Sequence, residues 1–167
     1  MNKWLELFSK DDYVGIKKYL KNGGNLEETN DLGESVLMCA LRARCDIDTI
    51  MLLIESGADV FEFDDEGVSV FDIAITYDYM DIVKYIMDKG IDINKTTRRS
   101  GFRPLMTATC YGRVDIVKLL LENGANKEIK DSKGFSSVDF ARKMNKKTIL
   151  ELFEYDENSP KNTAYAR

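Results

Sequence analysis

The chain has 167 residues, of which 44% are hydrophobic and 32% are charged, and its formal net charge is −5. It contains no histidine, the side chain that most often serves as a general acid or base near neutral pH, and its three cysteines include no CxxC pair that would suit zinc. No apolar run approaches the roughly 18 residues of a membrane-spanning helix, so the composition argues against a membrane protein, a zinc protein and a histidine-dependent enzyme.

Residues 1–32 predict a shortened pair of helices, with Trp4 and Phe8 in the first and Ile16 and Leu20 in the second. The start of the chain shows neither a long apolar stretch nor a small-residue cleavage site, so we expect no secretory signal. An odd number of scattered cysteines agrees with a reducing compartment. We therefore expect a cytoplasmic protein.

Glycines recur at a nearly constant spacing along the chain. One set is spaced by 34, 34 and 33 residues and the other by 34, 33 and 34: Gly33, Gly67, Gly101 and Gly134, and Gly23, Gly57, Gly90 and Gly124. A period near 33 is typical of repeat proteins with two helices in each unit. In the second unit we expect helices near residues 35–44 and 46–55, with one extra residue at Arg44–Cys45 that makes the turn between them irregular. The loop from Gly90 to Gly101 also holds an extra residue, within 96–100.

Three stretches carry the same motif in the second, third and fourth units. They are LLIESGADV (52–60), MDIVKYIMDKGIDIN (80–94) and GFRPLMTATCYGRVDIVKLLLENGAN (101–126). The last resembles the G-x-TPLH-x-AA-x-x-G-x-x-x-IVKLLL-x-x-GA pattern of the ankyrin-repeat family. This resemblance, which covers roughly residues 11 to 153, implies an all-α solenoid of helix-turn-helix units joined by extended finger loops. We expect an ankyrin-repeat domain over 1–153, with an N-terminal capping unit (1–32), full repeats over 31–64, 65–97 and 98–131, a C-terminal capping unit (132–153), and a flexible tail over 154–167.

The first helix of each unit departs from the family pattern, because without histidine the Thr/His pair of TPLH cannot form. Ser69 with Asp72, and Ser136 with Asp139, instead fit a capping box at the start of a helix. The methionines at the histidine position, Met38 and Met106, suit a core gap or an adaptable contact surface.

Charge is segregated along the chain. Residues 45–83 contain eleven acidic residues and no Lys or Arg, whereas residues 93–114 contain five basic residues and no acid. We expect an acidic finger at 61–68 and a basic finger at 95–103. The acids Asp64 and Asp65 are expected on exposed loops, where no burial raises a pKa for catalysis. The charge pattern is either a solvated surface or a two-signed binding surface that steers a partner.

In this family, the resemblance implies, partners bind the concave surface formed by the finger tips and the ends of the first helices. Tyr77 and Tyr111 are expected to stack there beside Phe102 and Arg99, unless these side chains only pack between adjacent units. Phe61 and Phe63 alternate on one face of the acidic finger. The candidate partner-binding residues are Arg42, Asp65, Glu66, Tyr77, Arg98, Arg99, Phe102, Arg103, Cys110, Tyr111, Lys133 and Phe135.

These features predict a non-catalytic protein–protein interaction module, a monomeric cytosolic adaptor or inhibitor with no cofactor, metal, membrane or nucleic-acid partner. A narrower alternative is an immunity-type or antitoxin-type inhibitor of a basic enzyme. An alternative of another class is a self-assembling structural protein or one that delivers a cofactor during assembly. No residue pattern supports catalysis, and the negative net charge argues against nucleic acid.

Overall fold

The computed structural model describes residues 1–155, which form helices, turns and extended loops with only isolated β-bridges at Thr29–Ser35 and Phe63–Ser69. The part of the expected tail beyond residue 155 lies outside the described residues, while Glu154 belongs to the last helix. No helix among the described residues is long and apolar enough to cross a membrane. The described helices are α1 (Asn2–Ser9), α2 (Tyr13–Lys21), α3 (Val36–Arg42), α4 (Ile47–Glu55), α5 (Val70–Thr76), α6 (Met80–Asp88), α7 (Pro104–Cys110), α8 (Val114–Glu122), α9 (Ser137–Lys143) and α10 (Lys147–Glu154).

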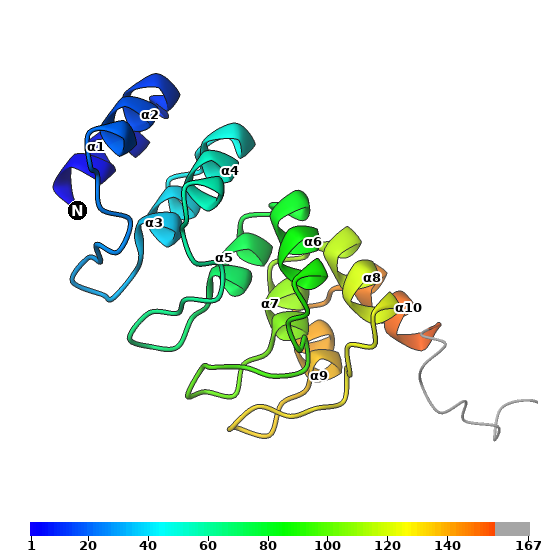
Figure 1. Ribbon diagram of the computed structural model, residues 1–167. Coiled ribbons are helices and arrows are strands. Elements are labelled where there is room, and N and C mark those ends of the chain that lie inside the picture. The colour runs from blue at the N-terminus through cyan, green and yellow to red at the C-terminus, as the bar shows by residue number, and fades with distance from the viewer. Residues whose placement is uncertain (156–167) are drawn as a thin grey trace, which may run out of the picture. The chain divides into compact units, whose positions relative to one another are not determined.

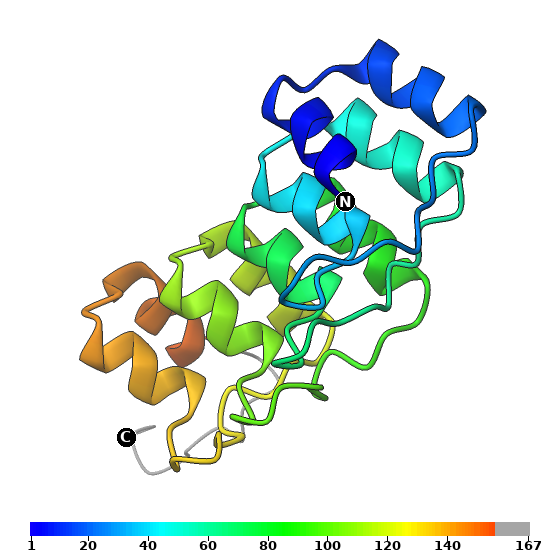
Figure 2. The ribbon, with the colours of Figure 1, turned by 90° about the vertical axis from the view of Figure 1, so that its left-hand side faces the viewer.

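The chain divides into two compact units. Unit 1 contains residues 1–91 and 97–99, with helices α1 to α6, and unit 2 contains residues 92–96 and 100–167, with helices α7 to α10. In unit 1 the first helices of the pairs, α1, α3 and α5, form one layer beside the second helices (Figures 1 and 2). In unit 2, α7 packs on α9 and α8 packs on α10. The expectation of an all-α repeat fold is confirmed.

Local sequence signals start the helices as expected. The Ser69 hydroxyl accepts the backbone N–H of Asp72, and a carboxylate oxygen of Asp72 accepts the backbone N–H of Ser69, at 3.0 and 3.1 Å. Ser136 and Asp139 form the same reciprocal pair at the start of α9, at 3.2 and 2.9 Å. Both predicted capping boxes are therefore confirmed, and each satisfies two backbone donors that a helix start leaves unpaired.

Apolar side chains at helical spacing form the core of each unit. In unit 1, Trp4, Ile16 and Leu37 are fully buried, and in unit 2, Ile116 and Leu120 are. The methionines at the position where the family pattern has histidine are core residues too: Met38 is 0% exposed and Met106 is 1% exposed. Of their two predicted uses, the structure shows core packing.

The irregular turn expected at Arg44–Cys45 is confirmed. Four residues, 43–46, separate α3 from α4, whereas three, 77–79, separate α5 from α6. Arg44 has φ +60°, and the inserted Cys45 is buried at 1% exposure. The Tyr79 hydroxyl donates to the Cys45 carbonyl at 2.6 Å, and an Asp11 carboxylate oxygen accepts the Asp46 N–H at 2.9 Å. Polar contacts from two other helix pairs of unit 1 thus hold the inserted residue in place.

Four fingers connect the helix pairs: finger 1 (22–35), finger 2 (56–69), finger 3 (89–103) and finger 4 (123–136). In fingers 1, 2 and 4 one side-chain oxygen, from Asn30, Asp64 or Asp131, accepts the backbone N–H groups two and four residues further on, at 2.9 to 3.0 Å. This local bond closes the tip as an Asx-turn. Finger 3 carries Arg98 at the same position and cannot form it, because a guanidinium has no acceptor.

Candidate functional site

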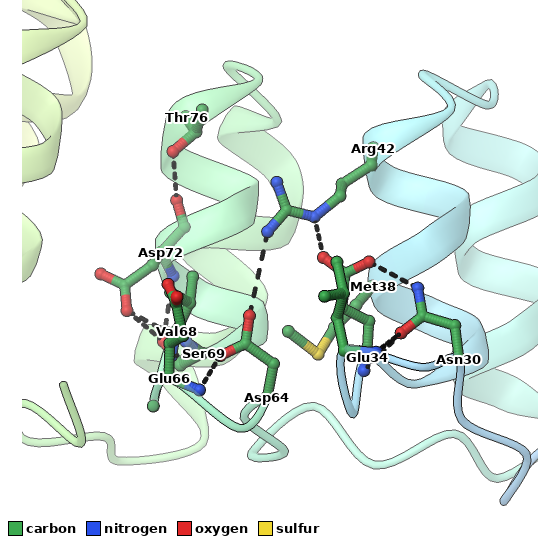
Figure 3. A network of polar contacts seen from close by, with 12 residues as sticks. Asn30, Glu34, Met38, Arg42, Asp64, Glu66, Val68, Ser69, Asp72 and Thr76 are labelled. Carbon is green, nitrogen blue, oxygen red and sulfur yellow. Dashed lines mark hydrogen bonds and ion pairs between the residues drawn. The ribbon is translucent and has the colours of Figure 1, made fainter.

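A network of polar side chains in unit 1 joins α3 to the bases of fingers 1 and 2 (Figure 3). Arg42, at the end of α3, forms an ion pair with Glu34, and its Nη2 lies 4.0 Å from a carboxylate oxygen of Asp64. The Asn30 amide donates to Glu34 Oε2 at 2.7 Å. Arg42 reaches these groups because helical side chains lean toward the N-terminus, so that it extends along Met38 toward residues that precede the helix.

The two carboxylates of this network are buried, whereas the guanidinium is partly exposed. Side-chain exposure is 7% for both Glu34 and Asp64 and 38% for Arg42. The expectation that Asp64 lies exposed is therefore wrong, because its Oδ1 turns inward to accept the N–H groups of Glu66 and Val68. Burial alone would lower the pKa of Arg42, but the charge of Glu34 and hydrogen bonds to nearby side chains raise it above its ordinary value. This arrangement places one positive and two negative groups within ion-pair reach of one another.

Tyr77 lies at the end of α5, beside the arginines of the α3–α4 turn. The Arg44 guanidinium carbon lies 5.2 Å from the centre of the Tyr77 ring, a cation–π distance, and the Tyr77 hydroxyl is one of the groups that raise the pKa of Arg42. The structure therefore brings the predicted residues Arg42 and Tyr77 together in unit 1. Arg44 was missed by sequence reasoning, although its place next to the inserted Cys45 marked this turn as unusual.

The acidic tip of finger 2 presents Asp65 and Glu66 to solvent. The Asp65 N–H donates to the Leu32 carbonyl of finger 1 at 3.2 Å, so the two tips are joined through backbone. On its other side, the Gly67 carbonyl accepts from Thr97 Oγ1 at 2.6 Å. A Cβ on Gly67 would lie 2.2 Å from the Thr97 carbonyl oxygen, so only glycine allows this approach.

The predicted basic residues of unit 1 adjoin this acidic tip. A Cβ on Gly67 would lie 3.0 Å from the Cα of Arg98, so the backbone of Arg98 passes directly beside the finger 2 tip. The Arg98 side chain is half-buried and has contacts of its own, whereas Arg99 is exposed. The backbone of a basic segment thus adjoins the acidic tip within unit 1.

Arg103 has a structural role in unit 2 that its residue type did not reveal. Its Nε donates to the Asn94 carbonyl at 3.0 Å, and its Nη1 donates to the carbonyls of Gly101 and Lys130 at 2.8 and 3.0 Å. The half-buried guanidinium ties finger 3 to itself and to finger 4. Because these donors are occupied, Arg103 fixes the shape of the loop in addition to carrying a positive charge.

The predicted aromatic residues of unit 2 form a cluster with Phe140 of α9. The ring centres of Phe102 and Phe140 are 5.2 Å apart, those of Phe135 and Phe140 are 5.9 Å apart, and Lys143 Nζ lies 5.4 Å from the Phe135 ring centre. Phe102 thus packs on an aromatic ring of the next helix pair, whereas Phe135 is 39% exposed. At the end of α7, Tyr111 is 55% exposed.

The remaining candidates fall within the same two units. Lys133 is exposed at the tip of finger 4, and Cys110 is half-buried at the end of α7. Unit 1 holds six candidate residues and unit 2 holds the other six, so the expected stacking of Tyr77 on Tyr111 stays a prediction. The described part of the chain contains no group of three or more Cys, Asp or Glu residues placed to hold a metal ion. Burial raises the pKa of Cys39 to about 11 and that of Cys45 to about 12, so both stay protonated thiols at neutral pH.

Comparison with known proteins identifies the repeat. A family model of three ankyrin repeats matches residues 7–97, and a model of a single ankyrin repeat matches residues 100–132. The chain is 40% identical over 107 residues to the E3 ubiquitin-protein ligase hecd-1 of Caenorhabditis elegans, a match that covers 64% of this chain and 4% of the ligase. It is 35% identical over 89 residues to the palmitoyltransferase ZDHHC13 of Homo sapiens, covering 53% of this chain and 14% of that protein. An ankyrin repeat protein of Acanthamoeba polyphaga mimivirus is 26% identical over 166 residues, covering 88% of this chain and 43% of the viral protein.

Proposed function

The chain belongs to the ankyrin-repeat family, and on that premise we propose that it is a cytoplasmic adaptor or inhibitor that binds one protein partner through its finger tips and the ends of its first helices. Ankyrin repeats are generally protein–protein interaction modules and are themselves non-catalytic. The enzymatic activities named for the relatives are those of much longer proteins, of which this chain matches 4% and 14%. We therefore assign this chain the binding role and no activity of its own.

One observation carries the proposal: charged side chains at the finger tips have no ion-pair partner among residues 1–155. Asp65, Glu66, Arg99 and Lys133 are all exposed, and none forms an ion pair with another described residue. Elsewhere the chain pairs charges locally, as in Lys3 with Glu6. Unpaired charge at the tips supplies the complementary field that orients a partner and speeds association.

The two units differ in charge. Unit 1 has nineteen acidic and eleven basic residues, a net charge of −8, whereas residues 92–96 and 100–155 of unit 2 have eight acidic and eleven basic residues, a net charge of +3. A partner with charged regions of both signs would therefore meet a complementary region on each unit. Nucleic acid fits poorly, because unit 1 repels phosphate groups.

The test is capture from the native cell extract with a tip variant that reverses four charges: Asp65→Lys, Glu66→Lys, Arg99→Glu and Lys133→Glu. A matched control reverses exposed charges of helices α6 and α8 instead: Asp81→Lys, Asp115→Lys, Lys84→Glu and Lys118→Glu. We expect one protein to be enriched by the wild type and the control and lost with the tip variant. If captured proteins do not distinguish the tip variant from the control, the proposed surface is wrong.

The charge of unit 1 also favours a narrower version, inhibition of a basic enzyme, in which the captured partner is an enzyme whose turnover falls when the chain is added. Opposite charges on the two units equally allow association between copies of the chain. Sedimentation velocity at rising concentration separates these possibilities, since a partner-binding monomer keeps one sedimentation coefficient whereas a self-assembling protein does not.

A further inference from the structure

Finger 2 carries two large apolar side chains on its outer face, Phe61 and Phe63, which we term the aromatic surface. They are 48% and 55% exposed. Neither ring packs against another aromatic ring or a cation among the described residues. Leu32, on the finger 1 tip that is joined to finger 2, is 64% exposed as well. Apolar side chains gathered in this way indicate an interaction site rather than scattered surface residues.

The backbone holds both rings in solvent. Val60 and Asp64 are buried at 7% and 8% exposure and Glu62 is half-buried, whereas Phe61 and Phe63 between them are exposed. The Phe61 N–H is bonded to Asp59 Oδ1 at 2.9 Å, and the Glu62 carbonyl accepts from Val70 at 3.0 Å. Rings on a fixed segment lose little conformational entropy on binding.

The same position in finger 3 shows what a structural residue does there. Asn94 donates its side-chain amide to the Gly124 carbonyl at 3.0 Å, and its Oδ1 accepts the N–H of Asn126 at 2.7 Å, so it ties two fingers of unit 2 together. Phe61 has no polar group to make such bonds. A phenylalanine at this position therefore contributes exposed apolar area and no side-chain hydrogen bond between fingers.

The segment of finger 2 that carries the aromatic surface is acidic, although Arg98 adjoins its tip at Gly67. Asp59, Asp65 and Glu66 are exposed, Glu62 is half-buried, and no Lys or Arg occurs from residue 45 to residue 83. None of these four carboxylates forms an ion pair among the described residues. Aromatic faces and carboxylates both attract cations. The methylene groups of an arginine or lysine side chain also pack well on an exposed aromatic ring.

We propose that the aromatic surface and its acidic rim bind an extended, arginine-rich segment of the partner protein. This inference rests on the proposed function and names the chemistry of the partner at finger 2. An extended peptide places alternate side chains on one face about 6.6 Å apart, and Phe61 and Phe63 are likewise two residues apart along finger 2. Guanidinium groups at alternate positions then stack on the two rings, and their N–H groups reach Asp59, Asp65 or Glu66.

The probe is a fluorescein-labelled peptide of twelve residues that alternates arginine and alanine, with glutamate/alanine and serine/alanine peptides for comparison. Fluorescence anisotropy measures their binding to the full chain. We expect the arginine peptide to bind at least tenfold more tightly than the other two. The double variant Phe61→Ala/Phe63→Ala should weaken it at least tenfold, although the net charge is unchanged. Val14, on α2, is 74% exposed and serves as the control. The substitution Val14→Ala should alter binding less than twofold.

The double variant keeps the net charge of the chain, so it separates binding to the aromatic rings from attraction by the overall negative charge. Binding within twofold of wild type would mean that the peptide is held by the overall negative charge alone, and this would overturn the proposal. A preference for the neutral or acidic peptide would overturn it too. Self-association that the double variant abolishes would assign the aromatic surface to a second copy of the chain. Circular dichroism verifies that the exposed substitutions leave the helices intact.

Failure here is distinguishable from failure of the proposed function. If the captured partner depends on the tip charges but binds the double variant as well as wild type, the module function stands and this inference is wrong. If the arginine peptide binds at Phe61 and Phe63 while no tip-dependent partner is captured, this inference about finger 2 stands and the proposed function is wrong.

Discussion

Replacing Arg103 by serine sets two physical effects of opposite sign against each other. Helices α3, α5 and α9 each start at a serine whose hydroxyl accepts a backbone N–H, whereas α7 starts at Arg103 without such a bond. Arg103→Ser would supply this bond, which contributes about 1 kcal/mol to helix stability. If only the helix start mattered, the variant would be more stable than wild type.

The same substitution removes three hydrogen bonds from the guanidinium to the carbonyls of Asn94, Gly101 and Lys130, which are 2.8 to 3.0 Å long. Because the loop is partly exposed, we take the lower end of the range for bonds from charged donors, about 1.5 kcal/mol each. The gain at the helix start offsets only part of this loss. We therefore expect Arg103→Ser to lower the free energy of unfolding by about 3.5 kcal/mol.

Urea titration followed by circular dichroism at 222 nm measures this free energy, with the slope compared between variants to verify that the same transition is observed. Ser136→Ala is the matched control in unit 2, because the hydroxyl bonds it removes both join Ser136 to Asp139 at a helix start and none ties two fingers together; it should cost about 1 kcal/mol. Arg103→Lys keeps the charge but not the planar fork, so it should recover less than half of the loss. Equal or greater stability of Arg103→Ser would refute the structural role of the guanidinium.

Three further outcomes follow from buried or bonded side chains. Because burial raises the pKa of Cys39 to about 11 and that of Cys45 to about 12, a thiol reagent at pH 8 should label Cys110 first and the other two only as fast as the protein unfolds; mass spectrometry of timed samples measures this. A backbone hydrogen bond at the start of α9 lowers the pKa of Asp139, so its contribution to stability is present above the ordinary aspartate pKa and is lost as pH falls through the lowered value. Asp139→Asn should therefore lose less stability than wild type between pH 5 and pH 3 in urea titrations. Buried Lys127 donates to the carbonyl of Phe153 in α10. Lys127→Met should therefore speed amide exchange in the last turn of α10 about tenfold and leave exchange in α7 unchanged. Hydrogen-exchange measurements test this.

Local signals in the sequence were sufficient for the helices and their starts. The spacing of the glycines predicted the repeating helix pairs, and the capping boxes at Ser69 and Ser136 followed from residue types three positions apart. The extra residue at Cys45 was predicted from one changed interval. The capping boxes depend on contacts within a few residues, and the repeat and its extra residue follow from spacing along the chain.

The roles of the charged residues could not be predicted, because they depend on which loops lie within reach in space. Arg103 bonds to the Lys130 carbonyl, 27 residues away, and Arg42 reaches Asp64 of finger 2. Position in the repeat predicted that Asp64 is exposed, yet the turn it closes draws its carboxylate inward. A signal for the Arg42 pair was present, since Glu34, Met38 and Arg42 are four residues apart, near the spacing of one helix face.

Charge and shape are coupled in the fingers, and this decides how charge substitutions should be interpreted. Asp64 closes the tip of finger 2 with two backbone bonds, so replacing it changes the loop as well as its charge, whereas replacing exposed Asp65 changes charge alone. At the equivalent position of finger 3, the arginine at 98 adds positive charge and cannot accept backbone N–H groups. That finger is closed instead by Thr96, whose hydroxyl donates to the Phe102 carbonyl at 2.7 Å, and by the guanidinium of Arg103.

A basic finger in this chain therefore requires a closure of another kind. Reversing Arg103 along with Arg99 would change the shape of the finger and the charge that it presents to a partner at once. Reversing Arg99 alone separates the two effects: it should slow association with the partner at low salt and leave the free energy of unfolding within about 0.5 kcal/mol of wild type.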